Sequence, residues 1–158
     1  MRFDPITVDI RNLAEADLPR VLGIAEGANE ASRWPRQTFV EMLSGEFLSR
    51  RVALVATVAG LVEVVGFAVA SLVAPEAELE NIAVDPEVQR RGIGRQLLSQ
   101  LVKHLRHAGI ETLHLEVRIS NSAAIGLYKS LGFNETGRRP RYYSDPVEDA
   151  VLMTCELR

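Results

Sequence analysis

The chain has little cysteine, no long apolar run and no excess of positive charge, and each absence excludes a class of protein. Cys155 is the single cysteine among 158 residues, so an internal disulfide is excluded and a reducing, cytoplasmic location is expected. The formal net charge of −3 argues against nucleic-acid binding through a global basic field. The longest apolar stretch, 61–74, is broken by Glu63, Gly66 and Ser71 and is too short to span a membrane.

Targeting signals, repeats and the common nucleotide-binding loops are missing as well. Residues 1–9 lack the basic and apolar regions of a secretory signal. The chain has no G-x-x-x-x-G-K-[ST] loop, and Leu97 stands where a G-x-G-x-x-G loop starting at Gly92 needs its third glycine. Length and apolar content predict one domain over residues 1–158, which would bury roughly two-thirds of the surface of the unfolded chain.

Hydrophobic periodicity predicts helices and strands in a mixed α/β order. Alternating or continuous apolar residues predict strands, whereas spacings of three and four predict helices. The expected strands cover 6–10, 52–58, 61–72, 79–84, 112–117, a segment from 133, and 151–157. The expected helices cover 14–26, 35–45, 93–109 and about 121–132. A helical crossover between the strands that end at Val84 and Val117 predicts that these two are parallel, within a mostly antiparallel sheet flanked by helices.

The most informative segment is 89–95, Gln-Arg-Arg-Gly-Ile-Gly-Arg, between a strand that ends at Val84 and a long amphipathic helix. The first turn of a helix has free N–H groups and partial positive charge, and glycines let a bulky anion approach the backbone. Arg90, Arg91 and Arg95 would be disfavoured at this end of a helix unless an anion bound there. We therefore expect the segment to bind a pyrophosphate.

Two blocks of sequence resemble a known family. The spacing Gln89-x-x-Gly92-x-Gly94 is similar to the R/Q-x-x-G-x-G/A signature of the GNAT acetyltransferases. A second block comprises L-E-V-R at 115–118, N-S-A-A-I-G-L-Y at 121–128 and L-G-F at 131–133. Together, residues 78–157 resemble the RimI-type N-terminal acetyltransferases, the ribosomal-protein-alanine branch of that family. The resemblance implies a GNAT fold, acetyl-CoA as co-substrate, and the N-terminal amine of a protein, such as a ribosomal protein, as acceptor.

The resemblance also implies which residues bind the co-substrate. The expected positions are Ile82, Ala83, Val84, Gln89, Arg90, Arg91, Gly92, Ile93, Gly94, Arg95 and Asn121. In the family, the backbone near the position of Val84 donates a hydrogen bond to the thioester carbonyl, and the residue matching Asn121 hydrogen-bonds the pantetheine arm or the adenine side. From the residues alone, Ile82 and Val84 are equally compatible with a core, and Asn121 with a helix N-cap.

Two residues are expected to transfer protons, and two more to contact the acceptor. By resemblance, Tyr128 is the general acid for the leaving thiolate and Glu116 is the general base, acting directly or through one water. By composition alone, a tyrosine on an apolar helix face is usually core, and a lone strand carboxylate is usually solvated. Tyr142, expected in a loop between the last two strands, and Trp34 are expected near the acceptor, although Trp34-Pro35 inverts the family's usual Pro-Trp order.

Two other functions stay open: a GNAT enzyme that acetylates a small amine, and a catalytically silent acetyl-CoA-binding module. The Glu116/Tyr128 pair argues against the silent module, because binding alone needs neither an acid nor a base. A basic cluster at 138–141 disfavours an arginine-rich acceptor, for which an acidic rim is expected. No metal is expected, since His104 and His107 lie three apart on a helix without a third ligand.

Overall fold

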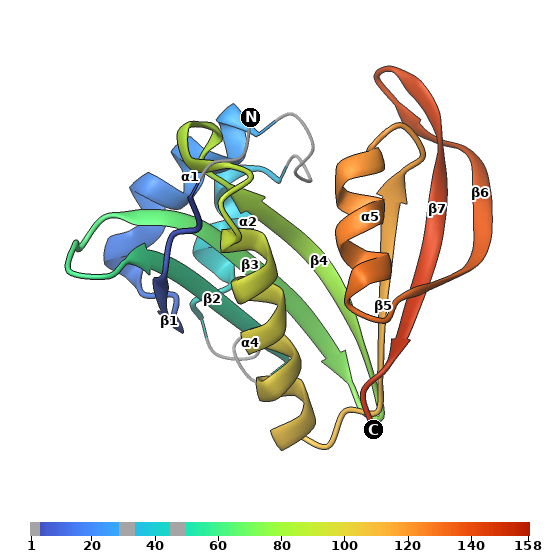
Figure 1. Cartoon of the computed structure of the whole chain (residues 1–158), viewed down its shortest axis with the longest axis horizontal. Coiled ribbons are helices and arrows are strands. Elements are labelled where there is room, and N and C mark those ends of the chain that lie inside the picture. The colour runs from blue at the N-terminus through green and yellow to red at the C-terminus, as the bar shows by residue number, and fades with distance from the viewer. Residues whose placement is uncertain (1–3, 29–33, 45–49) are drawn as a thin grey trace.

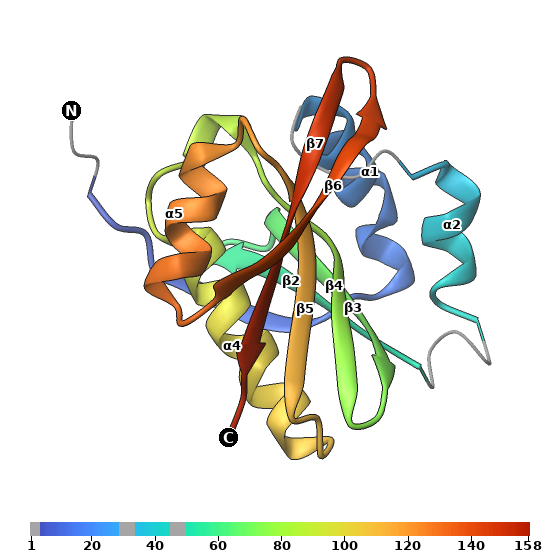
Figure 2. The same cartoon turned by 90° about the vertical axis from the view of Figure 1, so that its right-hand side faces the viewer.

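A seven-stranded mixed sheet separates two layers of helices in the computed structural model, which describes residues 4–28, 34–44 and 50–158 (Figures 1 and 2). The strands are β1 (Val8–Asn12), β2 (Arg51–Val58), β3 (Val64–Val73), β4 (Glu76–Val84), β5 (Thr112–Arg118), β6 (Asn134–Ser144) and β7 (Val147–Glu156). The helices are α1 (Leu18–Gly27), α2 (Arg36–Glu41), α4 (Ile93–His107) and α5 (Ser122–Ser130), with short 3-10 turns at Glu15–Asp17 and Pro86–Val88. The spatial strand order is β1-β2-β3-β4-β5-β7-β6.

The expected order of elements and the expected mixed sheet are confirmed. Among the described strands, β4 and β5 are parallel, and the other neighbouring pairs are antiparallel. A helical crossover, α4, joins the parallel pair, as a connection between parallel strands requires. The expected helix over 14–26 is split into a 3-10 turn and α1, and the strand expected from Leu61 begins only at Val64. Gly45, expected to end the second helix, lies outside the described residues.

Helices α4 and α5 cover one face of the sheet, and α1 and α2 cover the other (Figure 2). On α4, the side chains of Leu97, Leu98, Leu101 and Leu105 recur at helical spacing and are fully buried. Burying a leucine is worth about 1.5–3 kcal/mol, so this stripe fixes α4 firmly on the sheet. On the opposite face, Phe39 packs edge-to-face on Phe67, with 5.8 Å between ring centroids. None of the helices within the described ranges is long and apolar enough to cross a bilayer.

The parallel strands separate after a short paired stretch. Residues 76–78 of β4 pair with 112–114 of β5, and the two strands diverge beyond these positions. Figure 1 shows β4 and β5 meeting near the C-terminus of the chain and opening upward as a V. Crevices at the carboxyl ends of neighbouring strands are common ligand sites in α/β proteins. The divergence therefore creates room for a ligand in the middle of the sheet.

Candidate active site

A large cavity of about 1380 Å³ lies where β4 and β5 diverge. Its walls come from the second half of β4, the loop and first turn of α4, the end of β5, the start of α5 and the β6–β7 turn. Thirteen of the fifteen residues expected at the site line it: Ile82, Ala83, Val84, Gln89, Arg90, Gly92, Ile93, Gly94, Arg95, Glu116, Asn121, Tyr128 and Tyr142. Arg91 and Trp34 are not among the lining residues.

The start of α4 has the geometry expected of an anion site. Gly92 is the N-cap of α4 and adopts a left-handed conformation, with φ of 82°. This conformation is strained for a residue with a Cβ atom, which explains the glycine. The helix has no acidic residue in its first turn, so its free N–H groups and the positive end of its dipole face the cavity uncompensated. A helix start of this kind is suited to bind an anion.

Of the three arginines in this segment, Arg90 and Arg95 line the cavity and Arg91 does not. Arg95 lines the cavity, and its Nη2 donates a hydrogen bond of 2.7 Å to Ser130 Oγ on α5. Arg91 instead donates from Nε to the carbonyl oxygen of Asp4 at 2.8 Å, and its own carbonyl accepts from the N–H of Ile6 at 3.0 Å. The side chain of Arg91 therefore ties the N-terminal segment to the loop rather than pointing at the ligand space.

Gln89 and Asn121 complete turns at the edges of the cavity. Gln89 donates from Nε2 to the carbonyl oxygen of Val84 at 3.1 Å, which fixes the loop on the end of β4. Asn121 is the N-cap of α5, and its Oδ1 accepts from the N–H of Ala124 at 3.1 Å. The N-cap interpretation of Asn121 is therefore confirmed. A cap uses only the side-chain oxygen, so the side-chain NH2 group of Asn121 stays available to a ligand in the cavity.

Glu116 projects from β5 on the face opposite Leu113, Leu115 and Val117, as expected from their alternation. Its side chain is 19% exposed, and its Oε1 lies 3.2 Å from Nε of Arg139 on β6. A hydrogen bond to Glu116, and then the negative charge of that carboxylate, raise the pKa of Tyr142. The carboxylate is thus half-buried and contacts a cation and a phenol hydroxyl, rather than lying free in solvent.

Tyr128 is buried, with 6% of its surface exposed, and its ring packs on Phe133 with 5.6 Å between centroids. Burial, and then the nearby Tyr143, raise the pKa of Tyr128 to about 12. The hydroxyl therefore keeps its proton at neutral pH, as a proton donor must. Core packing and a place on the cavity wall are both found for this residue.

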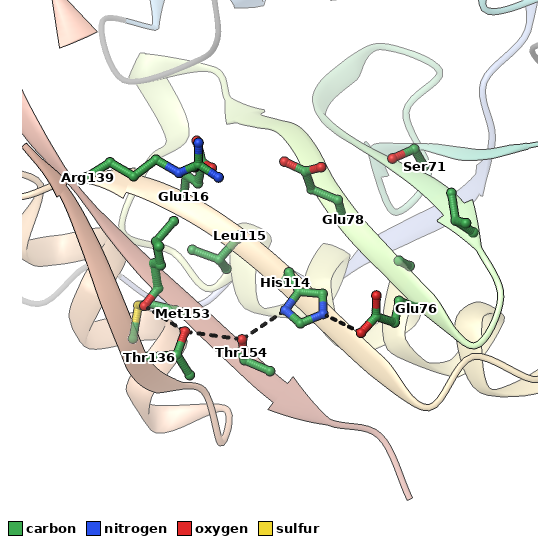
Figure 3. Close-up of a pocket in the computed structure, with 13 residues that line it drawn as sticks. Ser71, Glu76, Glu78, His114, Leu115, Glu116, Thr136, Arg139, Met153 and Thr154 are labelled. Carbon is green, nitrogen blue, oxygen red and sulfur yellow. Dashed lines mark hydrogen bonds and ion pairs between the residues drawn. The ribbon is translucent and has the colours of Figure 1, made fainter. Parts of the chain in front are cut away.

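A smaller cavity of about 360 Å³ adjoins the large one, and Glu116 lines both (Figure 3). A polar chain crosses it: Glu76 Oε1 lies 3.3 Å from His114 Nε2, and His114 Nδ1 lies 2.9 Å from Thr154 Oγ1. The pKa of Glu78 is raised by burial, then by the negative charges of Glu116 and Glu80. The second cavity thus presents a polar, carboxylate-rich wall on the side of β5 that carries Glu116.

The expected acceptor residues are only partly brought together. Trp34 packs on Phe39 with 5.3 Å between ring centroids, against the core beneath α1 and α2. Tyr142 is exposed and lies within β6 rather than in a loop, so its expected position was wrong although it reaches the cavity. Of the basic cluster, Arg138 pairs with Glu135 and Arg139 with Glu116, which reduces the positive charge near the cavity.

Several cavity residues were not expected as site residues. Arg118, Ser120, Tyr143 and Glu148 all line the large cavity and contact one another. The L-E-V-R motif contains Arg118, so a signal was present, but its partner lies thirty residues away and could not be identified from spacing. In the described part of the chain, no three histidine, cysteine or acidic side chains gather where they could hold a metal ion.

Comparison with known proteins adds an independent line of support. Residues 9–133 match the acetyltransferase (GNAT) family. The chain is 42% identical over 150 residues to the [ribosomal protein bS18]-alanine N-acetyltransferase of Escherichia coli strain K12, covering 94% of this chain and 97% of that protein. The crystal structure of the ribosomal-protein-S18-alanine N-acetyltransferase from Escherichia coli superposes with a TM-score of 0.83, over 96% of this chain and 94% of that one. The structure of Ard1 from Thermoplasma volcanium, 31% identical, also gives 0.83, over 96% and 98% of the two chains.

Proposed function

This chain belongs to the acetyltransferase (GNAT) family and is an N-acetyltransferase that uses acetyl-CoA, and we propose that its acceptor is the N-terminal amine of a ribosomal protein. The similarity to the alanine N-acetyltransferase of Escherichia coli supports this acceptor, since it spans nearly the whole of both chains. A single observation carries the chemistry: Glu116 and Tyr128, from different elements, line one cavity at the point where β4 and β5 diverge.

The loop and first turn of α4 would bind the co-substrate. Its N–H groups face the cavity, and Arg95 adds positive charge beside them. The pyrophosphate of acetyl-CoA would be the anion that binds to these N–H groups and to Arg95. The backbone of Ile82, Ala83 and Val84, which lines the same cavity, would run beside the pantetheine arm. Bound in this way, acetyl-CoA supplies an activated acetyl group next to Glu116 and Tyr128.

Glu116 and Tyr128 would move the two protons of the transfer. Glu116 accepts a proton from the acceptor amine, directly or through one water, as the N–C bond forms. Tyr128 donates its proton to sulfur as the C–S bond breaks, and its raised pKa keeps that proton in place until then. The products are an acetylated amine and the CoA thiol. Tyr142, which contacts Glu116, would help to orient the acceptor.

A thiol-release assay with acetyl-CoA tests this proposal. We expect release with a peptide that begins with a free alanine, and a mass gain of one acetyl group at its N-terminus. The same peptide already acetylated at its N-terminus is the matched control and should not react, even if it contains lysine. Reaction of small amines alone would favour a small-molecule acetyltransferase, and binding of acetyl-CoA without reaction of any amine would favour a silent module.

A further inference from the structure

A half-buried ion pair lies two residues beyond Glu116 on β5. Arg118 Nη1 is 3.1 Å from Oε2 of Glu148 on β7, with 23% and 17% of the two side chains exposed. Both residues line the large cavity. An isolated ion pair of this exposure adds little to folding stability. The other contacts that Arg118 and Glu148 make therefore matter more for the role of the pair.

Arg118 fixes the turn between β6 and β7. Its Nη1 donates to the carbonyl oxygen of Pro146 at 3.2 Å, and its Nη2 to that of Asp145 at 3.4 Å. Its guanidinium carbon lies 4.3 Å from the ring centroid of Tyr143. A planar guanidinium can make all these contacts at once, whereas an ammonium group cannot. Arg118 therefore holds both the turn and the ring of Tyr143 on β5.

Glu148 extends the same network to the start of α5. Its second oxygen, Oε1, accepts from the N–H of Ser120 at 2.8 Å, in the turn between β5 and α5. Hydrogen bonds from the hydroxyl and N–H of Ser120, and then from Arg118, lower the pKa of Glu148. The carboxylate therefore stays ionised while it connects β5, β7 and the turn that leads into α5, the helix that carries Tyr128.

We propose that Arg118 and Glu148 are positioning residues for acetyl transfer, which hold Glu116, Tyr128 and the β6–β7 turn in one fixed arrangement. The inference rests on the proposed function, because it assigns the pair a task relative to Glu116 and Tyr128. Neither residue touches the reacting atoms in this scheme. The pair sets the separation of acid and base, since Glu116 lies on β5, which carries Arg118, and Tyr128 lies on α5, which follows the turn that Glu148 contacts.

Two neighbouring observations support a task in catalysis. The β6–β7 turn follows directly on Tyr142 and Tyr143, and Tyr142 contacts Glu116 while Tyr143 lies close enough to Tyr128 to raise its pKa. A shift of the turn would therefore disturb both proton-transfer residues at once. Misplacement of reacting groups by about 1 Å can lower a rate roughly 100-fold.

The test compares kcat, KM for the acceptor peptide and acetyl-CoA affinity in four variants: Arg118→Ala, Arg118→Lys, Glu148→Gln and Arg118→Ala/Glu148→Gln. Arg138→Ala is the matched control, because Arg138 is an arginine of a nearby ion pair on β6 whose side chain lines neither cavity. We expect Arg118→Ala to lower kcat about 10–100-fold, while acetyl-CoA affinity, set mainly by the start of α4, changes less than about threefold. Arg118→Lys should recover part of the loss.

The combined variant separates positioning from general weakening of the fold. If the two residues act as one unit, the double variant is no slower than Arg118→Ala within about twofold, because coupled residues are not additive. Normal kcat in both Arg118→Ala and Glu148→Gln, fully additive losses, or an equal loss in Arg138→Ala would each overturn the inference. If Arg118→Ala fails to fold, Arg118→Lys and Glu148→Gln give the same comparison. A wild-type enzyme that acetylates no peptide would instead refute the proposed function, and this inference with it.

Discussion

Replacing Arg95 with alanine should weaken acetyl-CoA binding, whereas replacing Arg91 should change it little. The side chain of Arg95 lines the cavity at the start of α4, beside the N–H groups expected to bind the pyrophosphate. The side chain of Arg91 donates to the carbonyl oxygen of Asp4 and does not line the cavity. Arg91 lies in the loop just before α4 and Arg95 in the first turn of α4, so each is a control for the other.

The size of the effect follows from exposure. A hydrogen bond to a charged group contributes about 1.5–3 kcal/mol, and an exposed arginine such as Arg95 should fall around the lower end of this range, at about 1–2 kcal/mol. This corresponds to a Kd for acetyl-CoA that is about 5–30-fold higher. The net binding energy from Arg95 is reduced because its side chain already donates a hydrogen bond to Ser130. Arg95 must give up or share that hydrogen bond when it binds a phosphate.

Titration calorimetry with acetyl-CoA at low and high salt measures both variants. The loss in Arg95→Ala should shrink at high salt, because the interaction is between exposed charges. Arg91→Ala should bind within about twofold of the wild type at either salt concentration, a difference of less than 0.5 kcal/mol. An equal or larger loss in Arg91→Ala would refute the assignment of the two side chains, and unchanged binding in Arg95→Ala would leave recognition to the backbone alone.

Three further changes test other parts of the site. Gly92→Glu should abolish acetyl-CoA binding, as measured by calorimetry, because it adds a negative charge and a Cβ atom at a residue with φ of 82°. Gly92→Asn should retain most of the binding, because asparagine is neutral and tolerates that conformation. Glu116→Gln should lower kcat/KM. Raising the pH should recover part of this loss, because more of the acceptor amine is then neutral. A loss that does not depend on pH would exclude Glu116 as the general base. Because the pKa of Tyr128 is raised to about 12, the unfolded state ionises first, so stability is intact below pH 10 and falls by about 3 kcal/mol between pH 10 and 12. Denaturant unfolding of Tyr128→Phe should show a smaller fall over that range, and an equal fall would mean that the hydroxyl is not buried.

The elements that position the site could be predicted because their signals are local. The leucine stripe of α4 appears in the structure as expected, and so does the alternation on β5, where Leu113, Leu115 and Val117 face away from Glu116. A single long helix that crosses back over the sheet favours a parallel pair, and β4 and β5, joined by α4, form one. The cavity follows from that pair, since β4 and β5 separate after three paired positions.

The end of β6 could not be predicted in the same way. Most of this strand is exposed and polar, so it lacks the apolar alternation that marks a strand. Its pairing with β7 shifts register between Arg139 and Tyr143, and Arg141 has a positive φ of 52°. The N–H of Arg141 donates to Asp149 Oδ1 at 2.9 Å, a contact that stabilises the irregular turn of the chain. Tyr142 and Tyr143 follow this irregular turn directly, and their contacts with Glu116 and Arg118 join residues that are distant in sequence.

Side-chain directions within the predicted segments were the other limit. The sequence does not distinguish Arg91 from Arg95 as a phosphate ligand, yet Arg95 lines the cavity and Arg91 does not. The N-terminal segment passes beside the loop, and Arg91 hydrogen-bonds to it. Trp34 turns toward Phe39 and the core rather than toward the cavity. The Arg118–Glu148 pair was missed because it joins residues thirty positions apart, whose proximity depends on how β5 and β7 pair.

The most direct test of the account is the kinetics of Tyr128→Phe with acetyl-CoA and an alanine-terminated peptide. The substitution keeps the ring that packs on Phe133 and removes only the hydroxyl. We predict that kcat falls about 10²–10⁴-fold, the usual contribution of general acid catalysis, while acetyl-CoA affinity stays within about threefold. Near-normal kcat in this variant would contradict the account, because the buried hydroxyl would then be a core group without a part in the transfer.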